Sequence, residues 1–266
     1  MNFKEINATR LRLQGELVSH LVRKEFTLLY RDTRLGFIWS VASPLLLLGI
    51  YSFVFTRVFA LRWPGFSSPE FFALQLFVGM TFHLWLAECL QRAPGIVVSE
   101  AMMLKRVLFP VQVLPLVLVF VSLVQVLISC SLILLFTAAL GGLPASSIMV
   151  PFIVLPFCLL LIGLVSLIAA LGVYFRDLKM LMGFVSTALL FLSPIFYPVS
   201  LLPEAIQPFI WLNPLSYPIE AVRQLLFEAH WLEPVAYLIY CLSAAAVFLL
   251  GTSVFHKLQR GFNDVL

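Results

Sequence analysis

Two ionisable side chains, His83 and Glu88, lie within the long apolar segment that follows Glu70. An intramembrane enzyme keeps a general base or a metal ligand in such a place, so catalysis would begin with these residues. On a helix, however, five positions separate two side chains by about 140°, and the pair does not converge on one site. Glu88 also precedes Arg92 by four residues, a spacing that favours an ordinary ion pair. We therefore expect structural or interfacial roles for both, with substrate contact as the alternative.

Cysteines and glycine-rich turns are the other candidates for chemistry. The four cysteines stand singly in apolar surroundings, without a CxxC pair or a histidine at metal-ligand spacing, at Cys89, Cys130, Cys158 and Cys241. This pattern predicts buried, reduced packing residues and no metal site. A phosphate-binding GxxxxGK[ST] motif is missing, because Gly141-Gly142 is followed by Leu143-Pro144. If ATP drives this protein, we expect a separate chain to bind the nucleotide and its Mg²⁺.

The composition identifies the environment in which these residues work. Of the 266 residues, 62% are hydrophobic and 11% are charged, and the mean hydropathy is +1.04. Soluble domains carry about 25% charge, so a soluble globule is excluded. About 20 apolar residues cross a bilayer as a helix, and runs without alternation favour helices over barrel strands. The uncharged stretches predict six spans, at approximately 35–59, 71–91, 108–139, 148–173, 180–197 and 235–255.

The longest uncharged stretch has 69 residues, between Arg106 and Arg176. As one helix it would be roughly 100 Å long, so it must turn back, and the turn residues from Gly141 to Ser147 are the expected place. We thus predict an all-α integral membrane protein. It has a cytoplasmic N-terminal segment at 1–34, one six-helix domain at 35–255 and a cytoplasmic tail at 256–266.

The distribution of Lys and Arg predicts the orientation. Six spans place both termini on one side, and that side carries fourteen of the 17 Lys and Arg residues, against Arg57, Arg62 and Arg223 on the other. The positive-inside rule therefore places both termini in the cytoplasm. Orientation and contact with anionic lipid also account for the net charge of +4, so nucleic acid is not needed as a partner.

Three segments outside the spans have predicted structures of their own. Leu11–Tyr30 has the apolar spacing of an amphipathic helix, which either lies in the membrane interface or packs on a partner in the cytoplasm. The segment from Arg92 to Phe109 contains the break Ala93-Pro94-Gly95 and then a short helix. Prolines interrupt the apolar segment from Ser193 to Pro234, which predicts short helices that dip into the outer leaflet.

Aromatic side chains are the most numerous candidates for substrate contact inside the spans. Aromatic rings stack on sugars, but they also mark membrane interfaces or pack in cores. The shortage of charge argues against a proton- or sodium-coupled carrier, for which midplane carboxylates or repeated broken helices are typical. The candidates to line a pore at the first and fifth spans are Trp39, Tyr51, Phe55, Phe191, Phe196 and Tyr197.

Several short motifs, taken in order, give the chain a family resemblance. They are Tyr30–Trp39 (YRDTRLGFIW) followed by Pro44, Leu104–Pro110 (LKRVLFP), Phe175–Lys179 (FRDLK), Ser193–Pro198 (SPIFYP), Leu202-Pro203 and Asn213-Pro214-Leu215. In this order and at these distances, they resemble the permease subunit of type-2 ABC exporters that move polysaccharides and teichoic acids, the O-antigen exporter branch in particular. The resemblance covers nearly the whole chain.

The resemblance implies a six-span homodimer in the bacterial inner membrane, with an amphipathic interface helix at its N-terminus and no enzymatic activity of its own. It implies periplasmic re-entrant gate helices between spans five and six, here roughly Leu202–Ile210 and Tyr217–Phe227. A coupling helix after the second span would dock on a separate ATPase subunit, which agrees with the missing phosphate-binding loop. The residues of that helix would include Ile96, Val97, Ser99, Glu100, Met102 and Lys105.

Substrates of this family are undecaprenyl-diphosphate-linked glycans, so the resemblance also implies a pore between two protomers, lined in part by the aromatic residues above. A pyrophosphate is anionic and requires a cationic mouth near the cytoplasmic interface. Arg31 and Arg34, with Arg176 nearby in the predicted topology, are the candidates for that mouth. The alternative is that these arginines only orient the chain.

Two other functions stay open from the sequence. A type-2 ABC permease for a drug or a lipid would share the architecture and differ in its cargo. An intramembrane enzyme acting on polyprenyl lipids would require His83 or Glu88 for turnover.

Overall fold

A computed structural model describes residues 3–31, 35–54, 69–100 and 110–265. Every regular element within these ranges is helical, as predicted. The longer helices are α1 (Phe3–Arg31), α2 (Ile38–Phe53), α3 (Pro69–Arg92), α6 (Val113–Gly141), α7 (Val150–Tyr174), α8 (Leu178–Leu192), α10 (Ser216–Phe227) and α11 (Pro234–Leu258). The short helices are η2 (Ala93–Gly95), α4 (Ile96–Ser99), η3 (Ala145–Met149), η4 (Val199–Leu201), α9 (Gln207–Ile210), η5 (Gln259–Gly261) and α12 (Phe262–Val265).

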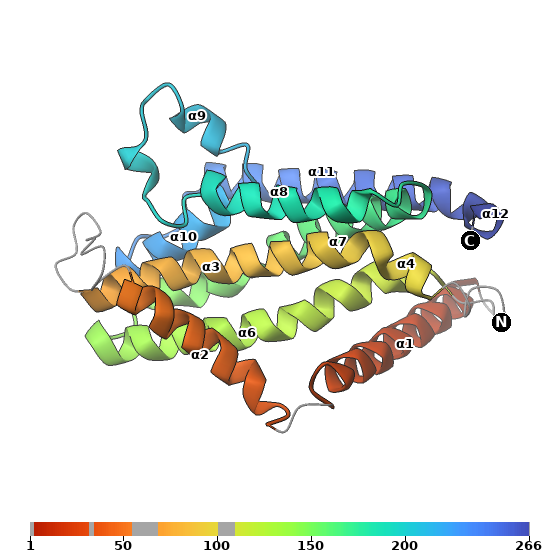
Figure 1. The fold of residues 1–266 in the computed structure, drawn as a ribbon, viewed down its shortest axis with the longest axis horizontal. Helices are drawn as coiled ribbons and strands as arrows, with labels where there is room; N and C mark the ends of the chain where they lie inside the picture. Colours follow the sequence, from red (N-terminus) through yellow and green to blue (C-terminus); the bar gives the residue numbers. More distant parts are fainter. Residues whose placement is uncertain (1–2, 32–34, 55–68, 101–109, 266) are drawn as a thin grey trace.

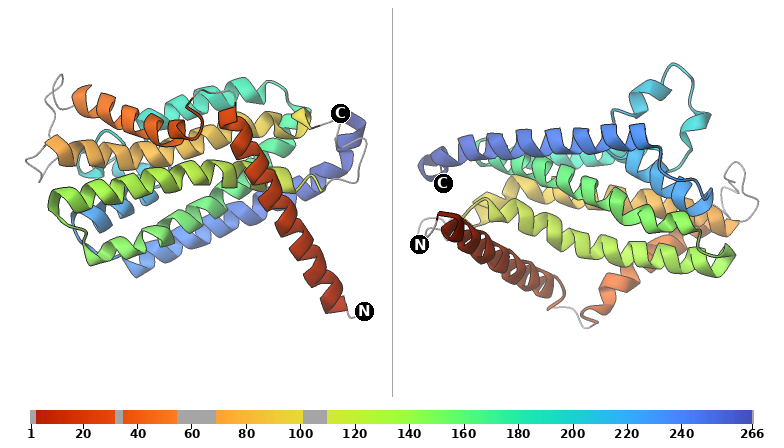
Figure 2. Two further views of the ribbon diagram at one scale, coloured as in Figure 1. Left: turned by 90° about the horizontal axis from the view of Figure 1, so that it is seen from below. Right: turned by 180° about the vertical axis from the view of Figure 1, so that it is seen from behind.

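The long helices lie side by side along the longest axis of the molecule (Figure 1). Both termini, α4 and α12 lie at one end of this bundle, which we call the N/C end, and α10 lies at the other, which we call the α10 end. The segment that carries α9 projects from the bundle at the α10 end. Helix α1 runs obliquely to the others, and its N-terminal part extends past them in the view from below (Figure 2). This position agrees with the predicted separate helix before the first span.

Four helical segments are long and apolar enough to cross a membrane, at Glu70–Ser99, Val113–Gly141, Ala145–Tyr174 and Pro234–Gly261. They correspond to the predicted spans two, three, four and six. The first and fifth predicted spans correspond to α2 and α8, which are apolar but have only 16 and 15 residues. At about 1.5 Å per residue these two helices are shorter than the roughly 30 Å hydrocarbon core.

The predicted turn within the longest apolar stretch is confirmed. Helix α6 ends at Gly141, and Gly142 has a φ of 86°, a backbone conformation that glycine adopts at no steric cost. After η3 the chain returns as α7. The hydroxyl of Ser146 donates a hydrogen bond to the carbonyl of Leu225, which joins this turn to α10.

Helices α7 and α11 form the most closely packed pair. A Cβ at Gly163 of α7 would lie 2.5 Å from the Cα of Phe248 of α11, and a Cβ at Gly251 would overlap the backbone of Gly163. Small residues allow helix backbones to approach this closely in membrane proteins. Helix α3 is also largely buried, and its Trp85 ring contacts the ring of Phe157 of α7. These helices form the core of the bundle.

The segment after α8 differs in part from the prediction. Helix α10 confirms a helix at 217–227, but the residues from 202 to 210 are helical only at α9. Pro203 and Pro208 prevent a continuous helix there, because proline lacks an N–H group and clashes with the preceding turn. Likewise, the helix predicted after Gly95 is described only at α4, and residues 101–109 lie outside the described part of the chain.

Candidate functional site

The segment formed by η2 and α4, which we call the coupling segment, follows α3 at the N/C end and lies against α7. Gly172 of α7 makes this contact possible, because a Cβ there would lie 2.6 Å from the Cα of Pro94. Ala93 and Val97 are completely buried. Val97 belongs to an apolar cluster with residues of α6, α7, α11 and α12, namely Leu114, Ala169, Ala170, Val173, Phe255 and Phe262. The coupling segment is therefore fixed to the core of the bundle.

The residues predicted to dock on an ATPase face in different directions. Ser99 is exposed and Ile96 and Glu100 are half-buried, whereas Val97 has no exposed surface. Val97 thus belongs to the predicted helix, with its side chain directed into the bundle. Val98, which the prediction omitted, is 43% exposed and is the apolar residue on the outer face. Met102 and Lys105 lie outside the described residues.

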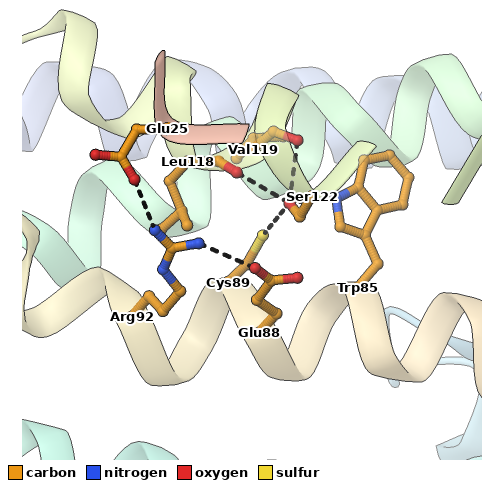
Figure 3. Close-up of polar contacts among 8 residues, drawn as sticks. All are labelled: Glu25, Trp85, Glu88, Cys89, Arg92, Leu118, Val119 and Ser122. Atoms are coloured by element: carbon orange, nitrogen blue, oxygen red, sulfur yellow. Dashed lines mark hydrogen bonds and ion pairs between the residues drawn. The ribbon is translucent and has the colours of Figure 1, made fainter. Parts of the chain in front are cut away.

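Arg92, the last residue of α3, joins α3 to α1 (Figure 3). Its Nη1 donates to Oε1 of Glu88 at 3.0 Å, and its Nη2 donates to Oε2 of Glu25 at 3.4 Å. We call these three residues the Arg92 bridge. All three side chains are about one third exposed, so each ion pair contributes only about 0.2 to 1 kcal/mol. The predicted pair of Glu88 and Arg92 is confirmed, and the link to α1 was not predicted.

A second polar contact, one turn from the bridge, joins α3 to α6. The indole Nε1 of Trp85 donates to the hydroxyl of Ser122 at 3.0 Å, and the thiol of Cys89 lies 3.5 Å from the same hydroxyl (Figure 3). Glu88 lines a cavity of about 400 Å³ between α1, α2, α3 and α6. In the described part of the chain, no group of three His, Cys, Asp or Glu side chains is placed to hold a metal ion. These contacts and the Arg92 bridge join α3 to both α6 and α1.

Four of the predicted aromatic residues lie together at the α10 end. Tyr51 and Phe196 both pack against the buried Phe72 and Leu76 of α3. The rings of Phe191 and Phe196 are 6.3 Å apart between centroids, and the hydroxyl of Tyr197 donates to the carbonyl of Phe191 at 3.0 Å. We call Tyr51, Phe191, Phe196 and Tyr197 the aromatic surface.

The other two predicted aromatic residues are not part of this surface. Trp39 is near the opposite end of α2 and is 37% exposed. Phe55 lies outside the described residues.

The predicted arginines of a cationic mouth do not meet in the structure. Arg31 ends α1 and Arg176 lies in the turn between α7 and α8, and both are exposed. In Figure 1 the end of α1 and that turn lie on opposite sides of the bundle, with α3, α6 and α7 between them. Arg176 is therefore not near Arg31, contrary to the expectation from topology. Arg34 lies outside the described residues.

Arg223 of α10 is buried, with 2% of its surface exposed, although it was predicted as a charge of the outer side. Its Nε and Nη2 donate to the carbonyl of Gln75 at 3.1 and 2.9 Å, Nη1 donates to the carbonyl of Pro194, and Nη2 donates to that of Ile195 at 2.8 Å. Nη1 also pairs with Glu220 at 3.2 Å. We call these five residues the Arg223 cluster. It joins α10, α3 and the segment that leaves α8.

A buried guanidinium is stable only when its donors are satisfied and its charge is paired, and the Arg223 cluster meets both conditions. Burial lowers the pKa of Arg223 to about 10, and the charge of Glu220 opposes this shift, so Arg223 stays protonated at neutral pH. One signal in the sequence pointed to this site. Glu220 and Arg223 stand three residues apart in an otherwise apolar helix, a spacing that predicts an ion pair.

Residues 16–227 match the model of the ABC-2 type transporter family, and the chain belongs to this family. It is therefore a transport subunit and not an enzyme, and an ABC ATPase partner is typical of such proteins. The matched range includes the coupling segment, the Arg92 bridge, the aromatic surface and the Arg223 cluster.

Among individual proteins, the chain is similar to the O-antigen export system permease protein RfbA of Myxococcus xanthus. The two are 31% identical over 192 residues, which cover 72% of this chain and 71% of that protein. Two proteins of the same name from Klebsiella pneumoniae are 25% and 24% identical over 253 residues, which cover 94% of this chain and 95% of each relative.

Proposed function

We propose that the chain is the permease of an ABC exporter that moves an O-antigen-like, undecaprenyl-diphosphate-linked polysaccharide across the bacterial inner membrane. The observation that carries this proposal is the similarity to three proteins named O-antigen export permeases, two of which align over 94% of the chain. The family supplies the class of transporter, and these relatives supply the class of cargo.

The proposed topology has six crossings, with the N/C end in the cytoplasm. Four helical segments have the length of a span, and the shorter apolar helices α2 and α8 would form the other two crossings. The N/C end carries both termini, the coupling segment and the turn between α7 and α8 (Figure 1), and these elements or their neighbouring residues include Arg92, Arg176, Lys257 and Arg260. The positive-inside rule supports a cytoplasmic location for this end. The burial of Arg223 strengthens the asymmetry, since that residue is not a solvated outer charge.

The proposed docking site for the ATPase is the outer face of the coupling segment, with Val98 and Ser99 at its centre. Two copies of the ATPase would bind ATP and Mg²⁺, one for each permease chain of a homodimer. Because Val97 is buried against the core, a force applied to α4 acts on α7 and α11. Because Arg92 directly precedes η2, the same force acts through the Arg92 bridge on α1.

The proposed pore lies between two copies of the chain and is bounded by α2 and α8. Both helices present exposed apolar faces, including Phe53 and Phe184, which are 62% and 75% exposed. The aromatic surface is our candidate for contact with the glycan. Arg31 and Arg34 are the candidates to bind the anionic pyrophosphate. Arg176, in the turn before α8, would contact it from a separate position.

Deletion of the gene in the native host tests this function. We expect the mutant to lose its surface polysaccharide and to accumulate the lipid-linked glycan on the inner side of the membrane, and we expect the wild-type gene to restore export. Normal export in the mutant would contradict the proposal and point to another cargo, such as a drug or a lipid. A requirement for His83 or Glu88 in glycan turnover by the isolated chain would instead indicate an enzyme.

A further inference from the structure

Two motifs that carry the family resemblance, Ser193–Pro198 and Asn213-Pro214-Leu215, meet at the end of α8. The side-chain amide of Asn213 donates to the hydroxyl of Ser193 at 2.8 Å and to the carbonyl of Leu192 at 3.2 Å. Three of the four residues of the aromatic surface lie in the same stretch, residues 191–197, which we call the aromatic turn. The contact between the two motifs gives the aromatic turn a partner outside α8.

The middle of the aromatic turn is buried, although the aromatic side chains at its two ends are not. Ser193 and Ile195 have no exposed surface, whereas Phe191 is 64% exposed. Phe196 and Tyr197 are half-buried. Irregular backbone at a buried site costs free energy unless each polar group finds a partner within the protein. The turn therefore depends on hydrogen-bond donors.

Each of the five successive carbonyls of residues 191–195 accepts a hydrogen bond. The side chains of Asn213 and Arg223 supply three of these bonds, to the carbonyls of Leu192, Pro194 and Ile195. The turn itself supplies the other two, from the Tyr197 hydroxyl to the carbonyl of Phe191 and from the Ile195 N–H to the carbonyl of Ser193. We call Asn213 and Arg223 the clamp.

Both residues of the clamp are themselves held by elements other than α8. The guanidinium of Arg223 donates twice to the carbonyl of Gln75 of α3. Gly79 of the same helix leaves room for it, since a Cβ there would lie 3.2 Å from Nη2 of Arg223. The side-chain oxygen of Asn213 accepts from the N–H of Leu215 at 3.0 Å, directly before α10. The aromatic turn is thus fixed to α3 and α10 as well as to α8.

We propose that Asn213 and Arg223 are positioning residues for the cargo, because they hold the aromatic turn in one conformation and its rings in a preformed surface for sugar units. A preformed surface avoids the entropic cost of ordering the rings on binding. Stability alone does not call for a buried arginine, since well-packed apolar residues often serve a core as well. Its directional donors, however, fix the backbone atoms that they bind. The inference rests on the proposed function. The clamp acts at one end of α8, so tilting of the other end is compatible with it.

Asn213→Asp tests the clamp without removing the buried arginine. The carboxylate keeps an acceptor for the N–H of Leu215, but it cannot donate to Leu192 or Ser193. Fluorine NMR of the purified chain with 4-fluorophenylalanine in place of Phe196 reports the surroundings of that ring. We expect one narrow resonance with an intact clamp and a broadened or split resonance in Asn213→Asp, because the ring then samples several positions.

Two further variants control for the change of charge. The side-chain amide of Gln207 donates to the carbonyl of Leu202 at 2.9 Å, outside the aromatic turn, so Gln207→Glu is the matched control and should keep the narrow resonance. Asn213→Ser is neutral and keeps a weaker acceptor for the N–H of Leu215, but its shorter side chain cannot also reach Leu192. It should broaden the resonance as Asn213→Asp does. A narrow resonance in either Asn213 variant would overturn the clamp.

Transport in proteoliposomes that contain the permease and its ATPase tests the role of the clamp toward the cargo. The probe is the lipid-linked glycan extracted from the deletion mutant, and its transport is measured by protection from an external lectin. In both Asn213 variants we expect KM for the glycan to rise by about three- to tenfold, the equivalent of a weakened stacking contact. The maximal rate should stay near wild type, because the variants weaken binding and not the ATP-driven step. Gln207→Glu should change neither value.

The two measurements separate this inference from the proposed function. If the wild-type chain moved no glycan, the proposed function would be contradicted, and with it the role of the clamp toward sugars. The resonance needs no cargo and would still decide whether the clamp holds the ring. If the wild-type chain moved the glycan and KM were unchanged in the Asn213 variants, the function would stand and the positioning role would be overturned. A lower maximal rate at constant KM would overturn it as well, because the clamp would then act on the ATP-driven step.

Discussion

The α7–α11 pair and the helices α2 and α8 use glycine in opposite ways. Gly163 and Gly251 lie where the two backbones touch, so that any side chain would overlap the neighbouring helix. Gly49 of α2 and Gly183 of α8 face open space, with nothing within 4 Å of an added Cβ. The first pair is built for permanent contact, whereas α2 and α8 have faces that this single chain does not fill.

This difference separates a closely packed part of the protein, which we treat as fixed, from a part with unfilled faces, which we expect to move. The coupling segment is seated on α7 and α11, so the fixed part receives the force that we assign to the ATPase. The aromatic surface lies where the ends of α2 and α8 meet α3. If the pore is bounded by α2 and α8 as we propose, transport requires these two helices to change position relative to the core.

The largest effect should come from the contact glycines. Gly163→Ala or Gly251→Ala should destabilise the protein by about 3 kcal/mol or more, because the new methyl group overlaps backbone atoms that cannot move aside. Gly49→Ala and Gly183→Ala should change stability by no more than about 1 kcal/mol, in the stabilising direction, because alanine is the better helix former. Thermal unfolding of the detergent-solubilised protein measures both. Similar melting of all four variants would remove the distinction between the two regions.

Loss of the Arg223 cluster should be nearly as damaging. Arg223→Met leaves Glu220 and three backbone carbonyls without their donor, at a cost of about 3 kcal/mol or more. Arg223→Lys should fall between wild type and Met, because an ammonium group cannot reach all these acceptors from one position. Arg176→Met, at an exposed site, should stay within about 0.5 kcal/mol of wild type. Equal stability of the Met variants at 223 and 176 would argue against the cluster.

Neighbouring valines of the coupling segment should separate stability from coupling. Val97→Ala should cost about 2 kcal/mol, because it opens a cavity against α7. Val98→Ala should leave stability unchanged and weaken the stimulation of the ATPase, because it removes an apolar contact from the docking face. Melting temperature and ATP hydrolysis of the reconstituted complex distinguish the two. If Val97→Ala affected only hydrolysis and Val98→Ala only melting, our orientation of α4 would be wrong.

The Arg92 bridge should give the smallest effect. A double-mutant cycle with Glu25→Gln and Arg92→Gln should yield a coupling energy of about 0.2 to 1 kcal/mol, since both groups are partly exposed. High salt should weaken that coupling, because mobile ions screen exposed charges. Strict additivity of the two substitutions at low salt would show that α1 and α3 are not joined through these side chains.

Four of the apolar spans and the turn between α6 and α7 could be predicted, because they follow from runs of apolar residues and from Gly142, which are local features. The burial of Arg223 could not be predicted, because the carbonyl that it contacts on α3, that of Gln75, lies about 150 residues away in the sequence. The link from Glu25 to Arg92 could not be predicted for the same reason, because the partners are 67 positions apart in the sequence. The inward direction of Val97 was also beyond prediction, because a helix of four residues is too short to show a periodicity.

The most direct test of this account measures distances in the assembled transporter by pulsed electron spin resonance. One pair of spin labels is placed at Leu84 of α3 and Gly183 of α8, and a second pair at Leu155 of α7 and Leu242 of α11. All four positions are exposed or face open space. On addition of a non-hydrolysable ATP analogue to the complex with its ATPase, the distance between α3 and α8 should change and that between α7 and α11 should not. A constant distance between α3 and α8, or an equal change in both pairs, would contradict the division into a fixed core and moving helices.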